Sequence, residues 1–222
     1  MSVIDTLITD RTQAHVDRLQ QLMKIGWQNM TDDEKAEYIS GGADQLLDAN
    51  NQPLFDSQNE PIYSADPGGV QKGAYNYTDL NRVEEAVDYV ADELVQADTD
   101  IRQYAVDMDV AWDDAFAVPY DPADYSLTVK TDWADTDIPS ATQMARYISN
   151  LKLIQAAIPD ASAAWIPDSM NMINWENAND IEKLLKDVDI AVALLVEVKK
   201  GLIRSALAVN YSGEIYSGEG EA

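Results

Sequence analysis

The sequence predicts a mainly α-helical protein: a helical bundle with long coiled-coil-like helices, a small β-ribbon insertion and a short C-terminal strand. The helices are predicted from the stretch between Gly73 and Pro119, which holds neither glycine nor proline, and from apolar residues that recur there at spacings of three and four. The β features are predicted from Asx-rich turns and from closely spaced glycines near the end of the chain.

Two short helices are predicted near the N-terminus. Thr12, Val16, Leu19 and Met23 share one face at helical spacing, and Gly26 follows them. The sequence Thr31-Asp32-Asp33-Glu34 is a capping box, in which the first and last residues each bond the other's backbone amide, so it opens a further short helix.

A ribbon is predicted between these helices and the glycine-free stretch. Within residues 47–66, the segment Asp48–Phe55 resembles the segment Asp56–Tyr63, since each is an Asx-rich turn followed by an apolar pair. This tandem repeat predicts a small β-hairpin or ribbon inserted between helices. A long ordered loop is the alternative interpretation.

The glycine-free stretch predicts a helix of roughly thirty residues, about 45 Å long at 1.5 Å per residue. Thr78 or Asp79 is the expected N-cap. The apolar seam of this helix consists of Leu80, Val83, Val87, Val90, Leu94, Ala97, Ile101, Tyr104 and Met108.

Two more helices and one strand are predicted in the second half of the chain. Alternation through Asp121–Trp133 predicts a strand, whose candidate partner is Tyr211–Tyr216. A helix follows Ser140 and ends before Pro159. The last helix begins near Asn179 or Asp180, and its apolar positions are Ile181, Leu185, Val188, Val192, Leu195 and Leu202.

These elements divide the chain into six consecutive segments, separated where glycine, proline or Asx-rich runs interrupt the helical pattern. The segments are the N-terminal helices (1–43), the β-ribbon or loop insertion (44–72), the long helix (73–118), the strand and loop (119–139), a helical hairpin (140–210) and a C-terminal docking tail (211–222).

Composition excludes several functional classes. The formal net charge is −25, and because phosphates and anionic lipids repel such a chain, binding to nucleic acid or to a membrane surface is not expected. The chain has no cysteine, which excludes disulfides, thiolate catalysis and cysteine-based zinc sites. Neither an export signal nor a run of about 20 apolar residues is recognisable, so a soluble protein is expected.

Residues that could carry chemistry are few. The single histidine, His15, does not face Asp17 on a helix, so the two do not form an acid–base pair by spacing. Neither a hydrolase elbow nor a glycine-rich nucleotide loop occurs. The acidic clusters at 107–114 and 132–137 could bind Ca²⁺, but they do not match an EF-hand loop, and a solvated face or a helix cap is favoured. We therefore expect no catalytic residue, no metal site and no cofactor.

Charge along the long helix limits how it can assemble. Acidic residues flank its apolar seam and would repel one another in a parallel pair of identical helices. The expected partners are basic residues elsewhere in this chain or on another protein, and solvation of the acidic face is the alternative. The flanking acids are Asp79, Glu84, Glu93, Asp98, Asp100 and Asp107.

Four stretches together carry a family resemblance. These are KGAYNYTDLNRVEEAVDYVADEL (72–94), TDWADTDIPSATQMARYISNL (131–151), IPDSMNMINWENANDIEKLLKDVD (166–189) and YSGEIYSGE (211–219). About half of the chain thereby resembles small tail, baseplate or minor structural proteins encoded by phages and prophages of Gram-positive, often gut-dwelling, bacteria. The resemblance implies a virion component that is made in the bacterial host and assembled with other virion proteins. It supplies no catalytic residues.

The expected function is that of a non-enzymatic virion structural protein, present in several copies, that links tail or baseplate components or receptor-binding fibres. Tyr211, Ile215 and Tyr216 are the candidate assembly residues, in a terminal strand that docks on a neighbour by strand addition. The alternative function is a host-surface, carbohydrate-binding module at a fibre tip. Its candidate residues are Phe55 and Tyr63 on the predicted ribbon.

Overall fold

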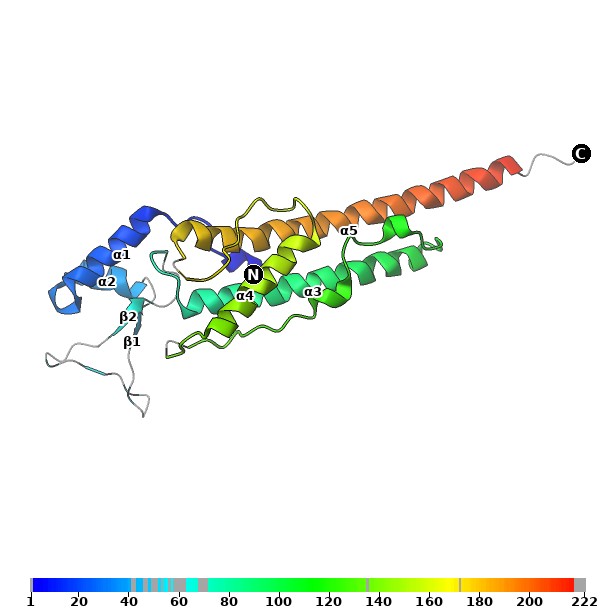
Figure 1. Ribbon diagram of the computed structural model, residues 1–222. Helices are drawn as coiled ribbons and strands as arrows, with labels where there is room; N and C mark the ends of the chain where they lie inside the picture. Colours follow the sequence, from blue (N-terminus) through cyan, green and yellow to red (C-terminus); the bar gives the residue numbers. More distant parts are fainter. Residues whose placement is uncertain are drawn as a thin grey trace, which may run out of the picture.

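The computed structural model describes residues 2–40, 43–45, 48, 52, 54–55, 57, 63–67, 72–134, 136–171 and 173–217. The fold is mainly helical, as the sequence predicts. Figure 1 shows an elongated body in which α3 (Tyr77–Asp107), α4 (Ala141–Ala157) and α5 (Trp175–Ser217) pack together. The smaller helices α1 (Gln13–Ile25) and α2 (Asp32–Ser40) lie at one end.

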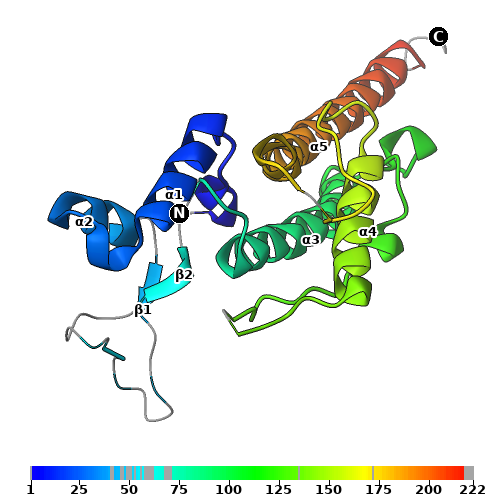
Figure 2. The same cartoon turned by 60° about the vertical axis from the view of Figure 1, so that its left-hand side comes forward.

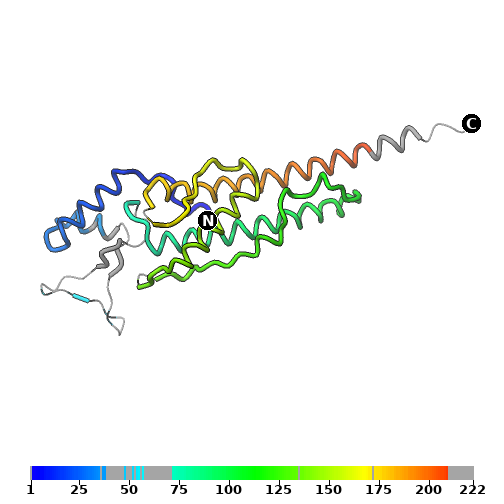
Figure 3. Tube along the Cα trace, viewed as in Figure 1, coloured from blue at the N-terminus to red at the C-terminus, as the bar shows by residue number. Residues whose placement is uncertain are grey.

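The core lies where α3 and α5 run side by side, with α4 packed across them in both views (Figures 1 and 2). The predicted seam of α3 is confirmed, because the positions from Leu80 to Ile101 are buried while Tyr104 and Met108 pack partly buried beside them. Figure 3 shows that α5 continues past the end of α3. The core residues of α5 are Ile181, Leu184, Leu185, Val188, Val192 and Ile203.

Side-chain caps fix where the long helices begin. The N-cap of α3 is Asn76, two or three residues before the expected Thr78 or Asp79, and its Oδ1 accepts a hydrogen bond from the Thr78 amide at 2.8 Å. Asp79 completes a capping box by accepting from the Asn76 amide at 2.9 Å. A reciprocal pair of side-chain bonds between Asn174 and Asn177 opens α5 earlier than predicted. The Ser140 cap on α4 is confirmed.

Four short 3₁₀ helices complete the helical elements among the described residues. They turn the chain where it enters the bundle, after α1 and between α3 and α4. They are η1 (Val3–Thr6), η2 (Trp27–Asn29), η3 (Asp114–Phe116) and η4 (Pro122–Tyr125).

The strand predicted in residues 121–133 is wrong. Residues 126–134 form an extended strap without a strand partner among the described residues, because side chains of α3 and α4 bond its backbone instead. Glu84 accepts from the Lys130 amide at 3.0 Å, and Asn81 accepts from the Trp133 amide at 2.7 Å. From α4, Asn150 donates to the Thr128 carbonyl at 3.0 Å.

The β-ribbon predicted within residues 47–66 is not seen as such. Two short strands, β1 (Ala43–Gln45) and β2 (Tyr63–Pro67), pair antiparallel with an irregular register, Ala43 opposite Pro67 and Gln45 opposite Tyr63. This pairing sets Tyr63, the last residue of the tandem repeat, opposite Gln45, which precedes the repeat. Most residues of the repeat lie outside the described part of the chain.

The C-terminal strand is also wrong, because α5 continues in helical conformation through Tyr211 to Ser217. The intervening Gly213 costs only about 1 kcal/mol relative to alanine inside a helix. Once a helix is formed, each further residue adds a hydrogen bond, so one glycine does not stop propagation. Residues 218–222, including the second glycine of the duplication, lie outside the described residues.

Candidate functional site

A buried cluster of charges joins the N-terminal arm, which we define as residues 2–12, to α3 and α5. The Arg11 guanidinium donates to Asp79 at 2.8 Å and to Glu182 at 2.6 Å, and these three side chains are at most 1% exposed. Arg82 donates to both carboxylates from the edge of the cluster. Two cations thus neutralise two anions, and the pairing closes the N-terminal arm over the long helices.

The surroundings of this cluster are structural. Glu182 also accepts from the backbone amide of Ile8, and Asn179 bonds the Arg11 backbone amide at 3.0 Å and its carbonyl at 2.9 Å. Burial raises the pKa of the Asp79 carboxyl, and the charges of Arg82 and Arg11 oppose that shift. Because these groups are sealed from solvent and bonded to one another, they hold the arm in place.

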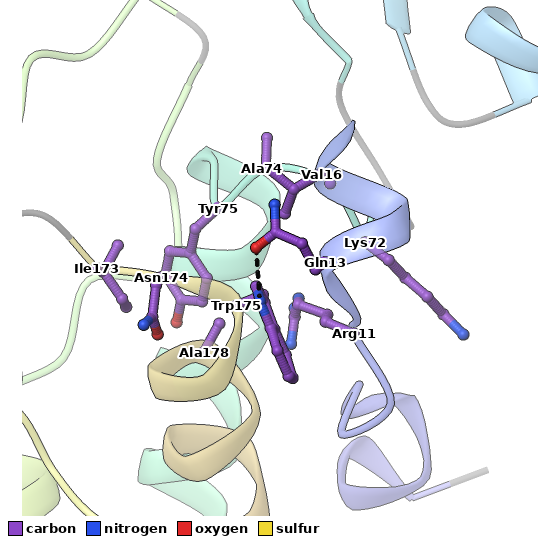
Figure 4. Close-up of a pocket in the computed structure, with 11 residues that line it drawn as sticks. Arg11, Gln13, Val16, Lys72, Ala74, Tyr75, Ile173, Asn174, Trp175 and Ala178 are labelled. Carbon is purple, nitrogen blue, oxygen red and sulfur yellow. Dashed lines mark hydrogen bonds between the residues drawn. The ribbon is translucent and has the colours of Figure 1, made fainter. Parts of the chain in front are cut away.

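A pocket of about 330 Å³ lies beside Arg11, between the start of α1 and the start of α5 (Figure 4). Tyr75 and Trp175 give it aromatic walls. Its polar groups are engaged within the chain: Gln13 accepts from the Trp175 indole at 3.2 Å and donates to Asp17 at 2.8 Å, and Lys72 pairs with Asp10. The pocket therefore offers aromatic surface with few uncommitted polar groups, and we do not place the function there.

The structure does not bring the two sets of sequence-predicted site residues together. Phe55 is half exposed, and Tyr63 begins β2 near α1 and α2. Tyr211, Ile215 and Tyr216 belong to the last turns of α5, at the opposite end of the molecule (Figure 1), and their side chains lie outside the described part. Their roles in host binding and in assembly stay predictions.

Other sequence candidates take local structural roles. The ring of His15 accepts from the Thr12 amide in the capping box of α1. In the first acidic cluster, Asp113 caps η3 by accepting from the Ala115 amide at 2.8 Å. Over the described ranges, no group of three or more histidine or acidic side chains could hold a metal ion. None of the helices described has the length and apolar character needed to cross a membrane.

The outer face of α5, opposite the core, carries an exposed apolar row that sequence reasoning missed. Ile190, Leu194, Val198 and Leu202 recur every four residues, and the first three are about 60% exposed. The spacing of Leu202 predicts a place in the core stripe, but its side chain is 43% exposed. The signal lay in the sequence, since a helix that is apolar on two faces buries only one of them against its own chain. We call these four residues the outer row.

The charge around the outer row differs from that of the rest of the chain. Between Ile190 and Asn210 there are three basic residues, Lys199, Lys200 and Arg204, and one acidic residue, Glu197. This segment therefore carries +2 in a chain whose net charge is −25. Lys199 lies on the inner side of α5, where it donates to the Ala115 carbonyl of η3 at 2.7 Å. The outer face is therefore mainly apolar with few charges, and such a surface is suited to contact with another macromolecule.

Comparisons of the chain with protein-family models, with curated proteins and with solved structures find no match.

Two partly buried carboxylates, Glu93 on α3 and Asp189 on α5, have raised pKa values. Burial raises the pKa of Asp189, and Asp5 adds to the shift. Burial also raises the pKa of Glu93, and Asp189 adds to that shift. A carboxyl whose pKa is higher in the folded state destabilises the fold when ionised, and this penalty is relieved as the pH falls through the raised pKa towards the unfolded value near 4.

We therefore expect Asp189→Asn to increase the free energy of unfolding at pH 7 by about 0.5 kcal/mol, a small figure because the site is partly solvated. The gain should shrink as the pH falls from 7 towards the unfolded-state pKa of about 4, because the wild-type carboxyl takes up its proton over that range. Urea titrations at several pH values measure both effects. Asp88→Asn, which removes the same charge from an exposed position on α3, is the control, and an equal gain there would contradict the prediction.

Proposed function

We propose that this chain is a non-enzymatic structural protein of a virion, which joins tail or baseplate components to one another or to receptor-binding fibres. The observation that carries the proposal is the outer row of α5, a line of exposed apolar side chains on a helix that extends beyond the bundle (Figure 3). The resemblance of the four sequence stretches to phage tail and baseplate proteins supports the virion setting.

The outer row has the geometry of a helix-packing surface. Side chains four residues apart form a ridge that fits the groove of a second helix. Ile190, Leu194 and Val198 each leave most of their surface in water. Covering that surface with apolar groups is favourable by about 25 cal/mol per Å² before the entropy cost of association is subtracted. A partner element that packs here would gain apolar contact along several turns.

The buried charges also support a structural role for the chain. Arg11, Asp79 and Glu182 are fully enclosed and paired, and Glu84 is paired with Arg146. These buried pairs hold the N-terminal arm and the strap against α3 and α5. A firmly packed body of this kind suits a protein that holds neighbouring components in fixed positions.

Mass spectrometry of purified phage particles tests the proposal. We expect peptides of this chain in particles purified from the bacterial culture that produces them, at a constant ratio to a major tail protein. In particles complemented with Leu194→Glu, the chain should be depleted at least roughly tenfold, whereas Val106→Glu, at an exposed position on α3, should leave its amount unchanged. Absence of the wild-type chain from particles would overturn the proposal.

A further inference from the structure

We infer that the partner of the outer row is a second copy of this chain, with the two α5 helices packed antiparallel and crossing at Gly201. The inference rests on the proposed function, because in both the outer face of α5 is the contact surface. The surface is self-complementary about one point, and three features of it show this: a glycine, a pair of opposite charges and the apolar row.

Gly201 lies on the outer face, where a second helix could approach closely. An ideal Cβ built at this position meets only the Arg204 guanidinium, at 3.9 Å. Packing within the described chain therefore does not require a glycine here, although glycine weakens a helix interior relative to alanine. A close approach of another backbone is a physical reason for it, since a missing side chain lets two helix axes come nearer.

Opposite charges lie at nearly equal distances on either side of Gly201. Glu197 precedes it by four residues and Arg204 follows it by three, and at about 100° per residue both lie on one edge of the outer face. In an antiparallel crossing at Gly201, Glu197 of each copy therefore meets Arg204 of the other. Within the monomer, Glu197 is 66% exposed and its carboxylate lies 3.8 Å from Lys200 Nζ, while Arg204 donates to the Tyr104 hydroxyl at 3.3 Å.

The apolar residues occupy the rest of the same face. Val198 and Leu202 lie on the edge opposite the charges, and in this register they meet Leu202 and Val198 of the second copy. Leu194 lies in the middle of the face and falls between Ser205 and Ala208 of the second copy, where small side chains leave room. A two-fold axis through the crossing relates the two halves, as in most homodimers.

Charge also favours the antiparallel over the parallel arrangement. A parallel pair would place Glu197 beside Glu197 and Arg204 beside Arg204. It would also set two bundles of net charge −25 side by side along their whole length. The antiparallel crossing offsets the bundles along the helix pair and places them on opposite sides of it, because the outer face points away from the core.

Sedimentation and light scattering of the purified full-length chain test the inference. We expect the mass to rise with concentration from the monomer's 24.6 kDa towards twice that value. Leu194→Glu should raise the dimer dissociation constant at least roughly tenfold, and the matched control Val106→Glu should leave it unchanged. A wild-type chain that stays monomeric overturns the inference, and because particle composition is measured separately, that result leaves the proposed function standing.

The register has its own test. Glu197→Lys and Arg204→Glu should each weaken the dimer roughly fivefold, and the double variant should restore it. Since the chain has no cysteine, the double variant Glu197→Cys/Arg204→Cys should form a covalent dimer under mild oxidation, while neither single variant should. Efficient cross-linking of a single variant, or an unrestored charge-swapped variant, would overturn the antiparallel crossing at Gly201.

Discussion

Replacing Glu182 with alanine is expected to lower the free energy of unfolding by about 3–5 kcal/mol. Glu182 is fully buried and accepts hydrogen bonds from Arg11 and Arg82 and from the amide of Ile8. Without it, two guanidinium groups share Asp79 as their carboxylate partner in the cluster, and a buried amide loses its acceptor. The penalty comes from leaving these groups uncompensated inside the protein, which costs more than the ion pair itself contributes.

Urea denaturation followed by circular dichroism measures this loss. The control is Glu176→Ala, which removes an exposed carboxylate from the first turn of the same helix and should cost no more than about 1 kcal/mol through the helix dipole. A second readout is proteolysis of residues 2–12, which should accelerate in Glu182→Ala because the arm is held by this cluster. Equal stabilities of the two variants would contradict the structural role of the cluster.

The helices could be predicted because their signals are local. The seam of α3, the Ser140 cap and the capping box at Thr31–Glu34 each depend on residues within a few positions of one another, and all three are confirmed. The cap of α3 was misplaced because Asn76 and Asp79 form a box together, with Asn76 as the N-cap. Such an error moves a helix end by two or three residues without changing the fold.

The buried charges could not be placed from the sequence. Asp79 and Glu84 flank the apolar seam, and their position predicts either solvated side chains or pairing with basic residues, in this chain or on another protein, without saying which. Arg82, three positions from Asp79, is a local partner, but the other cations, Arg11 and Arg146, lie 68 and 62 positions away along the chain. Pairing at that separation depends on the tertiary fold, so helical spacing alone cannot distinguish a buried carboxylate from an exposed one.

The predicted strands fail for a related reason. Alternation in residues 121–133 indicates an extended backbone, and residues 126–134 are extended, but the pattern does not say which groups will bond that backbone. The Asn81 and Glu84 side chains do so in place of a neighbouring strand. At the C-terminus, the glycines favour a turn locally, while the long helix that precedes them from Trp175 favours continuation, and the helix prevails through Ser217.

The outer face of α5 shows how a one-sided interpretation of a helix can miss an interface. Spacings of three and four were assigned to one core stripe, which placed Leu202 among the buried residues. The second periodicity, four residues from Ile190 to Leu202, was present in the same stretch. A helix with two apolar faces is typical of a buried helix or of one covered by a partner, and only the structure shows which face its own chain covers.

The strap provides the second large expected effect. Glu84→Ala should lower the free energy of unfolding by about 2–3 kcal/mol, less than for Glu182 because its partner Arg146 is partly exposed. Glu84 is buried, receives two bonds from Arg146 and accepts from the Lys130 amide at 3.0 Å. Its loss leaves a cation without its anion and the strap without one of its attachments to α3.

Hydrogen exchange separates this local effect from a general loss of stability. In Glu84→Ala, the Lys130 amide should exchange faster than in the wild type, and the Trp133 amide should follow because both attach the same strap to α3. The adjacent substitution Glu85→Ala removes an exposed carboxylate from the same helix and should change neither amide nor the unfolding free energy by more than about 0.5 kcal/mol. If exchange rises equally throughout α3 while the strap amides show no additional increase, Glu84 stabilises the helix bundle as a whole and does not specifically hold the strap.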